Sequence, residues 1–68
     1  MNRSFEENRQ MAEDALIDME YRRLRMMRTY NNYMKHGAVN AAAELLTEME
    51  ALESDIDCEK QIYKLTFL

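Results

Sequence analysis

The sequence predicts an all-α fold, an antiparallel helical hairpin in which two long helices meet at Gly37. The chain of 68 residues contains no proline and one glycine, and these are the two residue types that most often interrupt helices. Apolar residues recur at helical spacing on both sides of the glycine. Because a chain of this length buries little surface, we expect a single hairpin domain that needs a partner for full stability.

The first helix is expected over about residues 4–36. Ser4 and Glu7 match a capping box, in which the Ser4 hydroxyl accepts from the amide of Glu7 and the Glu7 side chain returns to the amide of Ser4. Lys35 followed by Gly37 is a typical C-terminal signal. Cations favour the negative end of a helix, and glycine adopts the left-handed cap conformation at little cost.

The apolar residues of the first helix fall on two faces when successive residues are placed about 100° apart. The larger face is predicted to pack on the second helix, and its members are Phe5, Ala12, Ala15, Leu16, Met19, Met26, Met27, Tyr30, Tyr33 and Met34. A smaller set, Ile17, Tyr21 and Leu24, lies on roughly the opposite side. One neighbouring helix cannot cover both faces, so the pattern predicts two partners for the first helix.

The second helix is expected over about residues 40–64, with Asn40 as its N-cap. Its apolar stripe comprises Ala38, Ala42, Leu45, Met49, Leu52, Ile56 and Tyr63. Alternating spacings of four and three residues are typical of antiparallel coiled-coil packing. Ser54 and Asp55 resemble a second helix start, which leaves open a kink near residue 54. Residues 65–68 are expected to form an apolar tip that either caps the hairpin beside Phe5 or docks elsewhere.

Charge is distributed in blocks along the chain, with a net charge of −4. Acids dominate residues 1–20, residues 21–43 carry five bases and no acid, and residues 44–59 carry seven acids and no base. Folding about the glycine places the basic block beside Glu48, Glu50 and Glu53, and the acidic N-terminal block beside Lys60 and Lys64. We therefore expect ion pairs across the hairpin that favour the antiparallel register.

The basic block also has an alternative interpretation, in which Arg22, Arg25 and Arg28 bind nucleic acid or an acidic protein. The net negative charge disfavours non-specific binding of nucleic acid by the whole molecule. Arg23 differs from the other three because it falls within the main apolar stripe. We expect its stem to cover the seam while its guanidinium reaches an acid such as Glu48 or a partner chain. The alternative is that this part of the first helix stays exposed until a partner binds.

Residues that chemistry usually needs are scarce. Cys58 is the only cysteine and His36 the only histidine, which excludes a disulfide framework and a zinc site and leaves no credible nucleophile and base pair. Glu50, Glu53 and Asp57 lie on neighbouring turns, a weak signal for Mg²⁺ because acidic helices produce such spacings by chance. We therefore expect no cofactor, no metal and no enzymatic activity.

The composition also bears on location. The first residues are too polar for a signal peptide, and no apolar run approaches the length of a membrane span. A single thiol is typical of a reducing compartment. We expect a cytoplasmic protein with no membrane partner.

The function expected from these features is binding without catalysis. We expect the hairpin to self-associate, most simply as a dimer that forms a four-helix bundle or coiled coil, and to act as a regulator or inhibitor of another protein. Phage-encoded inhibitors of host proteins are one group that fits this description. The predicted partner-binding residues are Ile17, Tyr21, Leu24, Arg22, Arg25 and Arg28. Two alternatives stay open: a nucleic-acid-binding hairpin that uses the arginines, and a structural subunit of a larger assembly.

Overall fold

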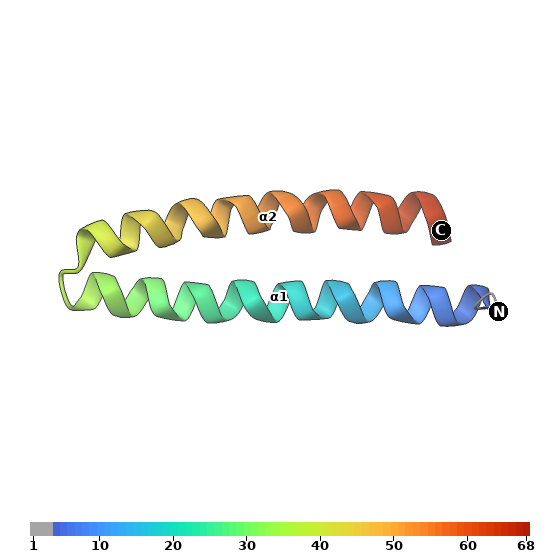
Figure 1. Ribbon diagram of the computed structural model, residues 1–68, viewed down its shortest axis with the longest axis horizontal. Coiled ribbons are helices and arrows are strands. Elements are labelled where there is room, and N and C mark those ends of the chain that lie inside the picture. The colour runs from blue at the N-terminus through green and yellow to red at the C-terminus, as the bar shows by residue number, and fades with distance from the viewer. Residues whose placement is uncertain (1–3) are drawn as a thin grey trace.

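Two antiparallel α-helices make up the computed structural model, which describes residues 4–68 (Figure 1). Helix α1 spans Phe5–Lys35 and helix α2 spans Val39–Phe67. The hairpin measures 51 × 19 × 16 Å, with the turn at one end and the start of α1 and the end of α2 at the other (Figure 1). The all-α hairpin that the sequence predicts is therefore confirmed.

The start of α1 follows the predicted cap. The Ser4 side chain accepts a hydrogen bond from the amide of Glu7 at 3.1 Å, and Glu6 and Glu7 place negative charge on the first turn, where the helix dipole favours it. The returning bond from the Glu7 side chain to the Ser4 amide is not formed among the residues described. Ser4 thus caps the helix without the second half of the capping box.

The turn is a Schellman motif centred on Gly37. This glycine has φ of +74°, its amide donates to the carbonyl of Met34 at 3.2 Å, and the amide of Ala38 donates to the carbonyl of Tyr33 at 2.8 Å. These two bonds satisfy carbonyls that the end of α1 would otherwise leave unpaired. The prediction of a left-handed glycine cap is confirmed.

Helix α2 begins directly out of this motif. Its N-cap is Ala38, which makes no side-chain capping bond, and the amide of Ala42 donates to the Ala38 carbonyl at 2.9 Å as the first helical bond. The predicted N-cap Asn40 is wrong, because Asn40 already lies inside the helix. The N-cap position falls on Ala38, whose methyl side chain has no oxygen that could accept a capping hydrogen bond.

The C-terminal half of α2 is also more regular than the sequence predicts. The helix runs without a break through Ser54 and continues to Phe67, three residues beyond the predicted end at residue 64. Tyr63 and Phe67 are one turn apart, and the Phe67 ring lies 5.5 Å from that of Phe5 and 5.2 Å from that of Tyr63. This aromatic contact stabilises the last helical turn of α2, and it closes the end of the hairpin beside Phe5.

The seam between the helices is buried mainly on the α2 side. Ala42, Met49, Leu52 and Ile56 are the fully buried residues, and no residue of α1 reaches the same burial. All seven residues of the predicted α2 stripe are buried or half-buried. In α1 the half-buried members of the predicted stripe are Ala12, Leu16, Met19, Met26, Tyr30 and Tyr33.

The predicted stripe of α1 is broader than the observed contact. Ala15, Met27 and Met34 are exposed, and so is Phe5 apart from its contact with Phe67. A single neighbouring helix covers only a narrow seam, so apolar residues at the margins of a broad stripe stay in solvent. The excess apolar surface of α1 therefore remains uncovered by α2.

Candidate functional site

An exposed apolar surface lies on the side of α1 that faces away from α2. Ile17, Tyr21 and Leu24 are 53%, 60% and 49% exposed, and with Leu16 and Glu20 they line a shallow groove of about 380 Å³. Their spacing of four and three residues places them one above the other on a single helix face. We call Ile17, Tyr21 and Leu24 the outer face of α1.

The outer face has charged residues of opposite sign at its two ends. Asp14 and Asp18 lie on the N-terminal side, and Arg25 and Arg28 lie on the C-terminal side. At about 100° per residue, all four fall within a sector of about 80° on the Tyr21 side of this face, which we call its flank. All four are exposed. The flank is thus acidic in its first half and basic in its second half.

The arginine block does not pair across the hairpin. Arg22 contacts Asp18 of its own helix at 3.2 Å, and Arg25 and Arg28 form no ion pair within residues 4–68. The predicted ion pairs with Glu48, Glu50 and Glu53 are therefore wrong. The physical reason is orientation, because the three arginines are exposed on α1 outside the seam that α2 covers.

Arg23 behaves in part as predicted. Its side chain is 28% exposed, and its Nε lies 3.4 Å from a carboxylate oxygen of Glu20. The stem therefore covers the seam while the head reaches an acid, but that acid is Glu20 and not Glu48. The register explains the difference: Arg23 lines a hollow with Ile56, whereas Glu48 lines another hollow with Tyr33, further towards the turn.

One ion pair among the residues described does cross the seam. The Lys60 Nζ lies 3.1 Å from a carboxylate oxygen of Glu20. The hydrogen bond from Lys60 is the main cause that lowers the pKa of Glu20, and the charges of Lys60 and Arg23 act in the same direction. The expectation that the acidic N-terminal block lies beside Lys60 is confirmed, while Lys64 forms no ion pair in the part of the chain described.

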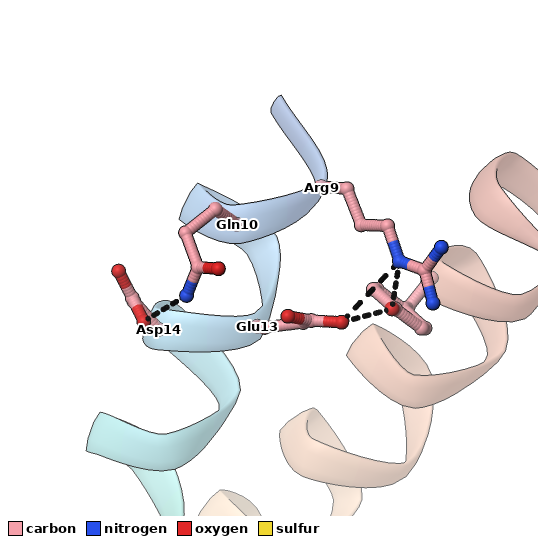
Figure 2. Close-up of polar contacts among 5 residues, drawn as sticks. Arg9, Gln10, Glu13 and Asp14 are labelled. Carbon is pink, nitrogen blue, oxygen red and sulfur yellow. Dashed lines mark hydrogen bonds and ion pairs between the residues drawn. The ribbon is translucent and has the colours of Figure 1, made fainter. Parts of the chain in front are cut away.

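A polar cluster near the open end of the hairpin joins the helices more specifically. The Tyr63 hydroxyl donates to Glu13 at 2.6 Å, and the Arg9 Nε donates to the Tyr63 oxygen at 3.0 Å and to Glu13 at 3.4 Å. Figure 2 shows Arg9 and Glu13 turned towards α2, while Gln10 and Asp14 contact each other away from it. The hydrogen bond from Tyr63 is the main cause that lowers the pKa of Glu13, and the bond to Tyr63 is the main cause that raises the pKa of Arg9.

This cluster was missed by reasoning from the sequence. Tyr63 is recognised there only as an apolar stripe residue, and Arg9 and Glu13 only as members of a charge block. One available signal is position, since residues 9 and 63 are nearly equidistant from Gly37 and therefore lie at similar heights in an antiparallel hairpin. The cluster has the features of a structural clasp, because its members hydrogen-bond to one another.

Groups that commonly carry catalysis are widely separated. His36 lies in the turn and Cys58 is an exposed free thiol far along α2, so at 1.5 Å per helical residue they are about 30 Å apart. Within residues 4–68 no three His, Cys, Asp or Glu side chains are grouped so as to hold a metal, Glu50, Glu53 and Asp57 included. Over the same residues, neither helix has a stretch apolar and long enough to cross a bilayer.

Comparison of the chain with protein families, with curated proteins and with solved structures finds no match.

Proposed function

We propose that this chain is a non-enzymatic regulator that binds another protein through the outer face of α1, in the cytoplasm. The observation that carries the proposal is the exposure of Ile17, Tyr21 and Leu24 on a side of α1 that α2 does not cover. Burial of an isoleucine or leucine side chain contributes roughly 1.5–3 kcal/mol. A partner that covers this face therefore gains apolar burial that the hairpin alone cannot supply.

The chemistry of the surroundings supports a protein partner. Tyrosine and arginine are enriched among the residues that dominate binding energies at protein interfaces, and Tyr21 lies between Ile17 and Leu24 with Arg25 and Arg28 close by. The two arginines form no ion pair within residues 4–68. They are available to a partner carboxylate, which favours a partner with an acidic segment next to an apolar one.

The proposal is tested by affinity capture from a cytoplasmic lysate with mass spectrometry. Tyr21→Ala combined with Leu24→Ala should abolish capture of a specific protein while helicity is unchanged, because central apolar and aromatic residues carry most of an interface's energy. A matched control is Ile62→Ala combined with Leu65→Ala on α2, whose side chains are 50% and 86% exposed. Full capture by the Tyr21/Leu24 variant, or equal loss with the α2 control, would contradict the assignment of this face.

A second candidate function is nucleic-acid binding by Arg22, Arg25 and Arg28. The specific observation in its favour is that Arg25 and Arg28 form no ion pair within residues 4–68. Arg28 and Lys35 also lie on one exposed surface of α1, and nearby cations are the usual means of binding phosphates.

Fluorescence anisotropy with a labelled RNA or DNA oligonucleotide distinguishes this candidate. Binding by the arginines should weaken steeply between low and physiological salt, because each neutralised phosphate releases counterions. Charge reversal at Arg22, Arg25 and Arg28 should abolish it, while Tyr21→Ala with Leu24→Ala should leave it unchanged. Absence of salt-dependent binding by the wild-type chain excludes this candidate.

A further inference from the structure

We propose that the occupant of the outer face of α1 is the same face of a second copy, packed antiparallel about Tyr21. The inference rests on the proposed function only in assigning this face to binding, and it differs in naming a second copy of this chain as the occupant. Two independent features of α1 support it: the order of the apolar residues and the order of the charges.

The apolar residues are arranged almost symmetrically about Tyr21. Ile17 precedes it by four residues and Leu24 follows it by three. If two copies of α1 run in opposite directions and meet at Tyr21, Ile17 of each copy lies opposite Leu24 of the other, with an offset of one residue or about 1.5 Å along the axis. All three side chains are about half exposed in the single hairpin. In the pair, the apolar side chains of each copy would bury those of the other.

The charged residues on the flank of this face are also arranged symmetrically about Tyr21, with acids before it and bases after it. Asp14 and Arg28 each lie seven residues from Tyr21, and Asp18 and Arg25 lie three and four residues from it. In an antiparallel pair related by a two-fold axis, each flank meets the same flank of the other copy. Asp14 then faces Arg28 of the second copy, and Asp18 faces Arg25.

This charge order discriminates between possible occupants. In a parallel copy, Asp14 and Arg28 lie at different heights along the paired helices, about 21 Å apart at 1.5 Å per residue, so their opposite charges do not meet. An unrelated helix would need a basic segment followed by an acidic one at matching distances. A second copy that runs in the opposite direction has that order already. It also provides the partners that Arg25 and Arg28 do not have within residues 4–68.

The test is a charge swap followed by sedimentation velocity or light scattering. The wild-type chain of 8.2 kDa should have twice that mass at roughly 100 μM. Asp14→Lys with Asp18→Lys makes the flank basic throughout, and Arg25→Glu with Arg28→Glu makes it acidic throughout. Each variant alone should dimerise at least about tenfold more weakly, because four cross-copy attractions become repulsions.

Mixing provides the decisive measurement. Equal amounts of the two variants should form a mixed dimer, and a chain that carries all four substitutions should dimerise like the wild type. A control with the same charge change and spacing on α2 is Asp55→Lys with Glu59→Lys, both exposed, which should stay dimeric. Circular dichroism verifies that each variant is helical, and the substituted side chains are exposed, so the fold does not depend on them.

The outcomes separate this inference from the proposed function. A monomeric wild-type chain, or two charge variants that fail to pair when mixed, overturns the second-copy assignment. If the chain is monomeric but Tyr21→Ala with Leu24→Ala still abolishes capture of another protein, the proposed function stands and this inference fails. If the charge swap restores pairing while the Tyr21/Leu24 variant captures that protein at full strength, this inference stands and the proposed function fails.

Discussion

Gly37 illustrates how a single residue determines the path of the chain. Its φ of +74° is a conformation that residues with a Cβ seldom adopt. No atom lies within 4 Å of the position that a Cβ would occupy there. A substitution at this position is therefore penalised by its own backbone and not by its neighbours.

Gly37→Val should accordingly destabilise the hairpin by roughly 1–2 kcal/mol, the cost of a left-handed conformation for a residue with a Cβ. Gly37→Asn should cost less, because asparagine visits this conformation more readily. Urea denaturation of the three chains measures the difference. Equal stability of the valine variant and the wild type would contradict the left-handed cap.

Glu13 and Glu20 make the stability of the hairpin depend on pH. Their pKa values are lowered in the folded chain, mainly by the hydrogen bonds from Tyr63 and from Lys60. The unfolded state therefore binds more protons in acid, so the stability from these contacts is present above the ordinary glutamate pKa and is lost as pH falls through the lowered one. We expect the melting temperature to fall as pH drops below about 4.5.

Three variants test this dependence. Glu13→Gln should flatten the change in melting temperature between about pH 5 and pH 3, while Glu59→Gln, which removes an exposed acid outside the contacts, should leave it nearly unchanged. Tyr63→Phe should raise the pKa of Glu13 towards its ordinary value, and an NMR titration of Glu13 measures this change. An unmoved Glu13 pKa in the Tyr63 variant would show that the hydroxyl is not the main cause.

At the scale of the element, the two helices contribute unequally. The fully buried residues Ala42, Met49, Leu52 and Ile56 all belong to α2. Helix α1 supplies only half-buried residues, and four of these are charged: Arg9, Glu13, Glu20 and Arg23. No residue of α1 is fully buried, and Ile17, Tyr21 and Leu24 lie on a side of this helix that α2 does not cover. These observations are why the proposed binding surface is assigned to α1.

Ile56→Ala should destabilise the hairpin by about 2–5 kcal/mol, because it removes buried methyl groups and leaves a cavity. Ile56 is 3% exposed, whereas Leu65 is 86% exposed, so Leu65→Ala should change stability by about 0.5 kcal/mol or less. Thermal melts monitored by circular dichroism compare the two variants. Similar effects of the two substitutions would contradict the seam described above.

The sequence predicted the elements well where one strong local signal acts. The serine cap, the glycine turn and all seven stripe residues of α2 are recognisable from local chemistry and helical spacing. The exposure of Ile17, Tyr21 and Leu24 follows from the same spacing. The exposed apolar face of α1 is thus predictable from the sequence.

The wrong predictions concern contacts that depend on the register of the two helices and on the direction of their side chains. Block charges alone placed the arginines beside Glu48, although Arg22, Arg25 and Arg28 are exposed outside the seam. The start of α2 depended on the Schellman bonds, which no propensity scale includes. The clasp of Arg9, Glu13 and Tyr63 depends on two side chains at matching heights on different helices, which is a tertiary property.

At the scale of the whole molecule, the hairpin is long and thin. Its dimensions of 51 × 19 × 16 Å leave room for one seam and no second layer. A chain of this size has few buried residues with which to offset its conformational entropy. Assembly is a direct way to add buried surface without lengthening the chain.

This leads to a prediction about melting. If folding is coupled to assembly, the melting temperature should rise with protein concentration, because association stabilises the folded chain by mass action. We expect a clear upward shift between about 1 and 100 μM for the wild type, measured by circular dichroism. Tyr21→Ala with Leu24→Ala should melt at a temperature that does not depend on concentration, since each chain then folds alone. A wild-type chain that melts cooperatively at one temperature over this range would show that the hairpin is a stable monomer, and the apolar outer face of α1 would then be free for an unrelated protein.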